Sequence, residues 1–161
     1  MGSVQSETLD RLLAVNRNDR APCIAPRGRV LVVNGYTDGR EMYVDYLRFS
    51  GFIVDAATDP IMALQLVRLR APDIIVTDFV FPTGCLDGPG FIARVRESLT
   101  DQRPPIIVVS GFTRQTDRQR AQHAGANRFL LKPCLPNELL HEVERAMATR
   151  RSSLAWRNRG D

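Results

Sequence analysis

Four polar side chains stand at the ends of short apolar runs of the sequence: Asn34, Asp78, Ser110 and Lys132. A carboxylate such as that of Asp78 can attack phosphorus and form an acyl phosphate. An ammonium and a hydroxyl group can hold the transferred oxygens while negative charge develops on them. If Asp78, Ser110 and Lys132 meet in the fold, they form a site that handles a phosphoryl group. Lys132 is informative because it is the one lysine among the 22 basic residues.

The apolar runs predict five β-strands, at residues 30–33, 52–54, 74–76, 106–109 and 129–131. Most of them are continuous rather than alternating, which is typical of strands covered on both faces. Helical stretches are predicted between and after them, at residues 38–49, from residue 60 onward, and at 90–99, 113–123 and 136–147. Asp38 and Glu41 form a candidate capping box for the first helix, and Asp59 before Pro60 is a candidate cap for the second.

This alternation of strands and helices predicts an α/β fold with right-handed crossovers. Such folds bind and react at the carboxyl ends of their strands. We therefore expect Asp78, Ser110 and Lys132 to converge at one edge of a parallel sheet, with Asn34 beside them.

One globular domain, residues 29–147, is predicted between two terminal segments of this 161-residue chain. In the segment 1–28, residues 5–17 carry leucines that favour an extra helix, and residues 18–28 are typical of a linker. The predicted domain has equal numbers of acidic and basic side chains, so the net charge of +4 lies in the termini. We expect the basic segment 148–161 to be a solvated tail, the alternative being contact with an acidic partner.

Composition argues against several classes of protein. A neutral domain lacks the basic face that nucleic acids require, and no room remains for a helix-turn-helix. No apolar run approaches the roughly 20 residues that span a bilayer, and the N-terminus lacks a secretion signal. We therefore expect a cytoplasmic protein that binds neither nucleic acid nor membrane. Cys23, Cys85 and Cys134 are too dispersed to suggest a disulfide framework or a zinc site.

Several short motifs, in their order and spacing, resemble the receiver domains of bacterial response regulators over about residues 29–147. The motifs are Pro72 to Asp78, Pro82, Asp87–Gly88, Val109 to Gly111, Ala124 to Ala126, and Phe129 to Pro133. The resemblance implies a flavodoxin-like (βα)5 fold, a doubly wound parallel sheet with strand order 2-1-3-4-5. It also implies a role in a two-component system or phosphorelay.

The resemblance assigns roles to four residues. It implies that Asp78 is the phosphoacceptor and that Ser110 and Lys132 contact the phosphoryl group. It places Phe129 at the aromatic switch position, where the ring turns inward on activation. The alternative for Phe129 is a static core aromatic, and the alternative for Asp78 is an acid that caps a helix or lies in a loop.

The family pattern breaks at the end of the first strand. Receiver domains carry two adjacent acidic residues there, which bind Mg²⁺, whereas this chain has Asn34 and Gly35. Mg²⁺ is normally held by one or two carboxylates and several waters in octahedral geometry. Asp78 and the backbone carbonyl of Val80 remain as candidate ligands. Asp38 is a further candidate, although a capping role accounts for it. We therefore expect weakened binding of Mg²⁺.

Two functions follow from this mixture. In the first, Asp78 accepts a phosphoryl group from a sensor histidine kinase or a phosphotransfer protein, with weak or unusual metal dependence. In the second, the chain is a pseudo-receiver, a constitutive protein-interaction module in which Asp78 simply pairs with Lys132. The retained set of Asp78, Ser110 and Lys132 favours the first, and the changes at Asn34 and Gly35 favour the second.

Other functions fit less well, and we expect no enzyme. A flavodoxin-like cofactor protein needs a phosphate-binding loop after the first strand, and residues 34–38 make a poor one. A haloacid-dehalogenase-type phosphatase needs a second Asp two residues after the nucleophile, where Val80 stands. We expect a stand-alone receiver that contacts a downstream protein through residues 113–147, with a homodimer and a monomer both open. The stretch from Pro82 to Gly88 exceeds the family's usual length, and a tolerated surface insertion accounts for it.

Overall fold

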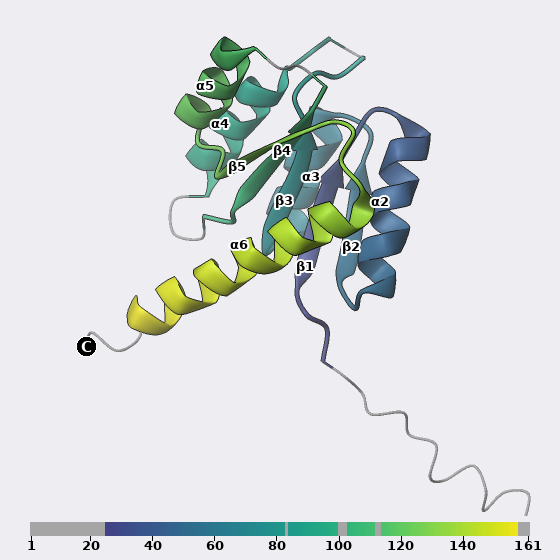
Figure 1. The fold of residues 1–161 in the computed structure, drawn as a ribbon. Coiled ribbons are helices and arrows are strands. Elements are labelled where there is room, and N and C mark those ends of the chain that lie inside the picture. Colours follow the sequence, from purple (N-terminus) through teal and green to yellow (C-terminus); the bar gives the residue numbers. More distant parts are fainter. Residues whose placement is uncertain (1–24, 83, 100–102, 112–113, 158–161) are drawn as a thin grey trace, which may run out of the picture.

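A computed structural model describes residues 25–82, 84–99, 103–111 and 114–157, with side chains as far as Ala155. Within these residues the chain alternates strand and helix from β1 to α6 (Figure 1). The helix predicted within residues 5–17, and linker residues 18–24, lie outside the described residues.

The strands form one parallel sheet in the order β2-β1-β3-β4-β5, which confirms the expected order. Their bounds are β1 (Arg29–Val33), β2 (Ile53–Ala57), β3 (Ile74–Asp78), β4 (Ile106–Ser110) and β5 (Arg128–Leu131). Every residue of β3 and β4 is buried, as their continuous apolar sequences predict. Asp78 and Ser110 therefore end two adjacent strands in the middle of the sheet.

Helices cover both faces of the sheet (Figure 1). Their bounds are α2 (Thr37–Phe49), α3 (Pro60–Arg70), α4 (Gly88–Ser98), α5 (Gln115–Ala124) and α6 (Pro136–Arg157). Val30 and Val32 of β1 belong to one apolar cluster with α2 and α6. Leu31 and Val33 belong to a second cluster with α3, α4 and α5. Because successive residues of β1 contribute to opposite clusters, the sheet is doubly wound, as expected.

The two predicted helix caps have different outcomes. Asp59 caps α3 as predicted, since its carboxylate accepts the N–H groups of Ile61 and Met62, both at 2.9 Å. These bonds, led by the one from Met62, hold the pKa of Asp59 below its usual value. The capping box of Asp38 and Glu41 is wrong. The N-cap of α2 is Tyr36, and Asp38 lies inside the first turn, because the helix begins one residue earlier.

Helix α6 is longer than predicted, so its expected end at residue 147 is wrong. The helix continues to Arg157, and its last turns extend past the amino end of the sheet (Figure 1). Arg150 Nη1 donates to Asp73 Oδ1 at 2.6 Å and to the Asp73 carbonyl at 2.8 Å. Arg151 Nη2 donates to the Arg27 carbonyl at 2.7 Å. These contacts involve the part of the chain that the sequence suggested to be a solvated tail.

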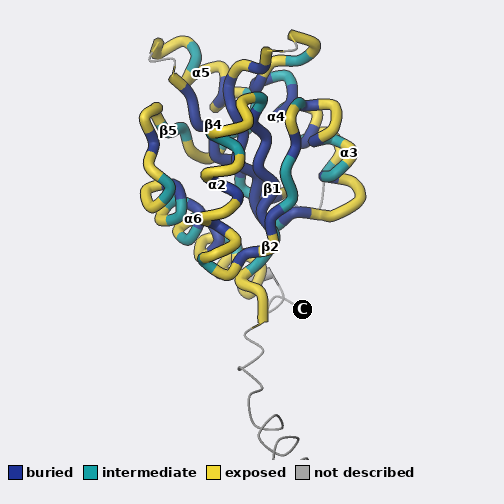
Figure 2. Tube along the Cα trace, turned by 90° about the vertical axis from the view of Figure 1, so that its right-hand side faces the viewer, coloured by how far each residue is buried: buried dark blue, intermediate teal, exposed yellow. Residues whose placement is uncertain are grey.

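Burial is concentrated in the strands, as Figure 2 shows. Among the described residues, the buried polar side chains are those of Asn34, Thr77, Asp78 and Ser110. All four lie at or beside the carboxyl ends of β1, β3 and β4, where the sequence places the chemistry. None of the helices in the described part of the chain has the length and apolar character needed to cross a membrane.

Candidate functional site

The structure brings Asp78 and Lys132 together at the carboxyl edge of the sheet. Asp78 ends β3, and Lys132 follows β5, two strands away. The Lys132 Nζ atom lies 2.8 Å from Asp78 Oδ1. Ser110 ends the intervening strand, β4, and its carbonyl accepts the N–H of Lys132 at 2.8 Å. The end of β4 thus fixes the backbone of Lys132, and its side chain reaches across to the carboxylate.

The carboxylate of Asp78 is buried and only half satisfied. Asp78 is 4% exposed. Its Oδ1 atom accepts a hydrogen bond from Lys132 Nζ, whereas Oδ2 has no hydrogen-bond partner among the described residues. Burial raises the pKa of Asp78, and the hydrogen bond and charge of Lys132 offset part of that rise. A buried acid with one oxygen held by a cation and the other left open is a feature of reactive rather than purely structural acids.

Phe129 of β5 packs against the residue that follows Asp78. Its half-buried ring packs edge-on against Phe79, the residue after Asp78, with 6.1 Å between the ring centroids. The guanidinium of Arg118 lies 5.6 Å from the Phe129 ring centroid. This packing connects Phe129 to the segment that carries Asp78. Its role as a switch stays a prediction.

Asn34 and Gly35 stand at the positions where receiver domains carry two adjacent acidic residues. Asn34 is buried, and its Oδ1 atom accepts the N–H of Tyr36 at 2.7 Å. Its carbonyl accepts a bond from Arg40 Nη1 at 2.9 Å. At Gly35, a Cβ atom would stand 2.5 Å from Cδ of Pro82, a distance that real Cβ atoms do not adopt. The side-chain oxygen of Asn34 is therefore already hydrogen-bonded, and Pro82 occupies the space that a side chain at position 35 would need.

The donor atoms at this edge are a poor fit to Mg²⁺, which prefers carboxylate and other oxygen ligands. The open Oδ2 of Asp78 is one suitable oxygen, and Val80 is exposed and offers a carbonyl nearby in the chain. Asp38 is exposed in the first turn of α2. Among the described residues, no group of three or more His, Cys, Asp or Glu side chains is placed to hold a metal ion. At positions 34 and 35 the site thus offers an amide and a glycine in place of carboxylates.

Two further residues at this edge were not singled out from the sequence. The Nζ atom of Lys132 lies 6.0 Å from the ring centroid of Tyr36, so an aromatic face borders the ion pair. Pro82, noted only as part of a motif, closes the space beside Gly35. The proximity of Tyr36 to Asn34 in the chain was a usable signal. The contact of Pro82 with Gly35 was not, because it depends on the path of the loop after β3.

The residues and fold together define a class of protein. The family model for the response regulator receiver domain matches residues 30–144, and the chain belongs to this family. Receiver domains are signalling domains of two-component systems. They generally bind Mg²⁺ for phosphorylation, and they interact with histidine kinases or phosphotransfer proteins.

Similar proteins fall into short and long types. An uncharacterized 14.6 kDa protein from Leptolyngbya boryana is 35% identical over 115 residues, covering 71% of this chain and 86% of its own. The transcriptional regulatory protein PrrA from Mycobacterium tuberculosis is 36% identical over 79% of this chain. This chain spans about half of PrrA, namely 52% of its length. Among solved structures, chemotaxis protein CheY4 of Vibrio cholerae aligns with a TM-score of 0.69 and 28% identity, covering 74% of this chain and 98% of CheY4.

Proposed function

We propose that this protein is a single-domain response regulator that accepts a phosphoryl group on Asp78. One observation carries the proposal, which is that Oδ2 of this buried carboxylate has no partner among the described residues while Lys132 holds Oδ1. The donor would be a phosphohistidine of a sensor histidine kinase or of a phosphotransfer protein. The cytoplasm is the compartment that fits such a donor.

The transfer forms one bond and breaks one. An Asp78 carboxylate oxygen attacks phosphorus, a P–O bond forms, and the P–N bond to the donor histidine breaks. The donor imidazole leaves with the electron pair of that bond. Lys132 and the Ser110 hydroxyl would then contact the oxygens of the new phosphoryl group, where negative charge is concentrated. Lys132 must exchange its present contact with Asp78 for one with the phosphoryl group, and this exchange supplies a switch.

The proposed dependence on Mg²⁺ is weak. The Asn34 oxygen already accepts a hydrogen bond, and Pro82 opposes any side chain at position 35. Charge compensation during transfer therefore rests more on Lys132 than it does in a receiver with the acidic pair.

The proposed output is a protein–protein contact. Residues 113–147, which include α5, β5 and the first half of α6, would form the contact surface for a downstream protein, in the way the family uses it. Phe129 lies on β5 within this range, so a change at Asp78 could reach the surface through Phe79. A homodimer is a further proposal. Neither nucleic acid nor membrane is a proposed partner.

The second candidate is a pseudo-receiver that acts as a constitutive interaction module. The observation that favours it is the closed packing of Pro82 against Gly35, since this leaves no space for the second acid. In that case the pair of Asp78 and Lys132 is only structural, and the protein has one signalling state.

The mass of the intact protein after incubation with acetyl phosphate distinguishes the two. We expect a gain of one phosphoryl group that is absent from Asp78→Asn and that changes little when Mg²⁺ is removed. A gain that needs Mg²⁺ would contradict the proposed metal dependence. No gain, either from acetyl phosphate or from a panel of phosphorylated histidine kinases, would establish the pseudo-receiver.

A further inference from the structure

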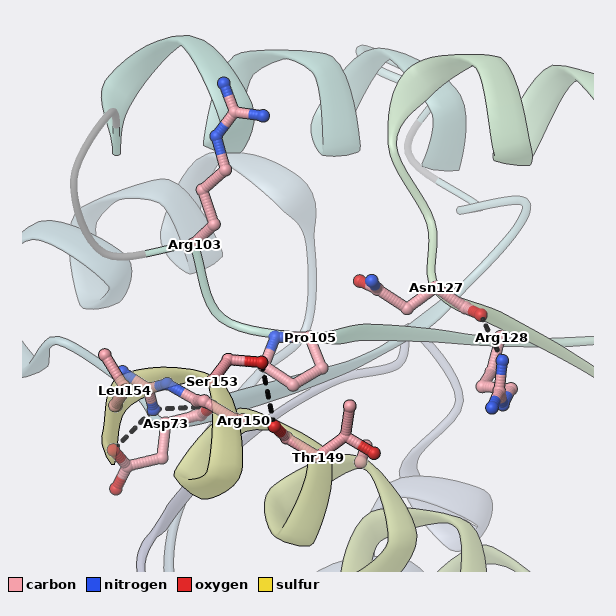
Figure 3. A pocket seen from close by; sticks show the side chains of 10 residues that line it. Asp73, Arg103, Pro105, Asn127, Arg128, Thr149, Arg150, Ser153 and Leu154 are labelled. Atoms are coloured by element: carbon pink, nitrogen blue, oxygen red, sulfur yellow. Dashed lines mark hydrogen bonds and ion pairs between the residues drawn. The ribbon is translucent and has the colours of Figure 1, made fainter. Parts of the chain in front are cut away.

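A cavity lies at the edge of the sheet opposite Asp78. Its volume is about 580 Å³, within the range of roughly 300–1,000 Å³ that is usual for small-molecule sites. It lies between the last turns of α6 and the segments that lead into β3, β4 and β5 (Figure 3). The walls are made by Asp73, Arg103, Pro105, Asn127, Arg128, Ala146, Thr149, Arg150, Ser153 and Leu154.

The α6 side of the cavity holds an acid that is already satisfied. Asp73 Oδ1 accepts from Arg150 at 2.6 Å, and Asp73 Oδ2 accepts the N–H of Arg29 at 2.9 Å. Arg150 bonds to the described residues through Nη1 alone, so its other N–H groups are available. The lining therefore contains one carboxylate, which Arg150 neutralises, and two further guanidinium groups, those of Arg103 and Arg128. Arg128 is paired with Glu142, with 3.5 Å between Nε and Oε2, which leaves Arg103 as the lining arginine without an ionic partner among the described residues.

Positive charge is uncompensated on the opposite side of the cavity. Arg103 makes no hydrogen bond or ion pair to a described residue, and its side chain extends away from α6 towards α4 (Figure 3). Arg96 donates to the carbonyls of Gly125 and Pro104 and to Asn127 Oδ1, all neutral acceptors. Burial and then the charge of Arg103 lower the pKa of Arg96. An anion near these two arginines would relieve their mutual repulsion.

Asn127 supplies a neutral donor to the same space. Its Oδ1 atom accepts the N–H of Ile106 at 2.8 Å and a bond from Arg96 Nη2 at 2.9 Å. These two bonds fix the orientation of the amide, and its Nδ2 group donates to no described residue. Figure 3 shows this side chain extending towards the cavity.

The remaining wall is apolar. Pro105, Ala146 and Leu154 line the cavity, and Leu154 is 43% exposed although it is a large apolar residue. A ligand that covers it would gain from burial of apolar surface as well as from charge. The uncompensated positive charge and the apolar wall together fit a ligand that has an anionic end and an apolar end.

We propose that this cavity binds an organic anion that carries a phosphate or carboxylate group and an apolar part. The site is separate from Asp78 and does not depend on its phosphorylation. It exists because α6 continues past residue 147 and faces the amino ends of β3 and β4.

The test is a titration of the isotope-labelled full chain with small probe molecules. Binding is monitored through the NMR chemical shifts of the backbone amides. The probes are phenyl phosphate, benzoate, benzyl alcohol and inorganic phosphate. We expect saturable shifts at the cavity residues with phenyl phosphate or benzoate, with a dissociation constant on the order of 1 mM, as suits fragments of this size. The stronger of the two identifies phosphate or carboxylate as the preferred group. Benzyl alcohol and inorganic phosphate should each bind at least about tenfold more weakly, because each lacks one of the two features.

Two variants and one matched control locate the site. Arg103→Gln should weaken the binding of phenyl phosphate about tenfold, because one charge-assisted contact is lost. Ser153→Phe should abolish saturable shifts by filling the cavity without a change of charge. Arg94→Gln, an exposed α4 arginine outside the lining, removes the same charge and should bind as the parent protein does.

Three results would overturn the proposal. They are the absence of saturable binding of either aromatic anion, equal binding of benzyl alcohol or inorganic phosphate, and parent-like binding by both Arg103→Gln and Ser153→Phe. A folded spectrum for each variant, recorded in the same titration, separates loss of the site from loss of the fold.

Discussion

The two edges of the sheet each carry an aspartate paired with a basic side chain, but the pairs differ in kind. At the carboxyl edge, Asp78 and Lys132 are 2.8 Å apart, and the Asp78 side chain is 5% exposed. At the amino edge, Asp73 and Arg150 are 2.6 Å apart, and the Asp73 side chain is 38% exposed. Both oxygens of Asp73 are bonded, whereas Oδ2 of Asp78 has no partner among the described residues.

The difference shows what separates a structural pair from a reactive one. Asp73 is solvated and saturated, and it fastens α6 to the sheet. Asp78 is desolvated and half satisfied, which costs free energy that a purely structural pair need not spend. A cost of this kind is retained where the open oxygen has a use, and acceptance of a phosphoryl group is such a use.

Removal of the cation from each pair should give the largest contrast. Lys132→Met leaves a buried carboxylate without its partner, and we expect a loss of about 2 kcal/mol, moderated because Lys132 is partly exposed. Arg150→Met should cost about 1 kcal/mol, because Asp73 is accessible to water. Urea denaturation at neutral pH measures both values. Equal losses would show that the two pairs are energetically alike and would remove the basis of the comparison.

The packing of Pro82 against Gly35 should be almost as costly to disturb. Gly35→Ala introduces a Cβ atom into the Pro82 ring, and we expect a destabilisation of about 2 kcal/mol from overpacking. Combination with Pro82→Ala should recover most of that loss. Gly111→Ala is the matched control, since a Cβ there would meet no atom of a described residue within 4 Å. Thermal unfolding compares the four proteins. An Ala at position 35 that is as harmless as at 111 would show that Pro82 does not close the site.

Introduction of an acid at the end of the first strand should create a metal site. Metal binding there should change the stability by less than Lys132→Met or Gly35→Ala does. Asn34→Asp places a second carboxylate at the end of β1, and we expect Mg²⁺ at about 10 mM to stabilise this variant by about 1 kcal/mol. The parent protein should gain much less. Ca²⁺ and a salt solution of equal ionic strength serve as controls in the same melting experiment. An equal Mg²⁺ effect on both proteins would mean that Asn34 does not limit metal binding.

The pH dependence of stability should give the smallest effect, and its sign follows from the raised pKa of Asp78. An acid with a raised folded-state pKa favours folding when protonated, and this contribution is lost as pH rises from the unfolded value of 3.8 through the folded value. The uncharged Asn of Asp78→Asn cannot ionise, so this variant does not lose that contribution to stability as the pH rises. The variant should therefore be more stable than the parent at neutral pH, with the difference vanishing below pH 3.8. Urea denaturation from pH 3 to pH 7 tests this, and a difference that grows on acidification would contradict it.

The carboxyl edge was easier to predict from the sequence than the amino edge. Asp78 and Lys132 each follow an apolar strand, so the parallel topology alone brings them to one edge, and the predicted strand order is confirmed. The end of α6 was missed, because residues 148–157 lack a regular apolar pattern. The absence of Gly and Pro between residues 137 and 157 was a signal that could have corrected this.

The sequence by itself determined the fold class and the convergence of Asp78 and Lys132, because hydrophobic periodicity and the position of each polar residue at a strand end are local properties. The strand order followed from the resemblance of its motifs to receiver domains. Only the tertiary structure decided the open Oδ2 of Asp78, the closure of Gly35 by Pro82 and the cavity beneath α6. Each of these depends on distances between segments that are remote in the chain. Such distances follow from how loops and helices pack on the sheet, which no local pattern encodes.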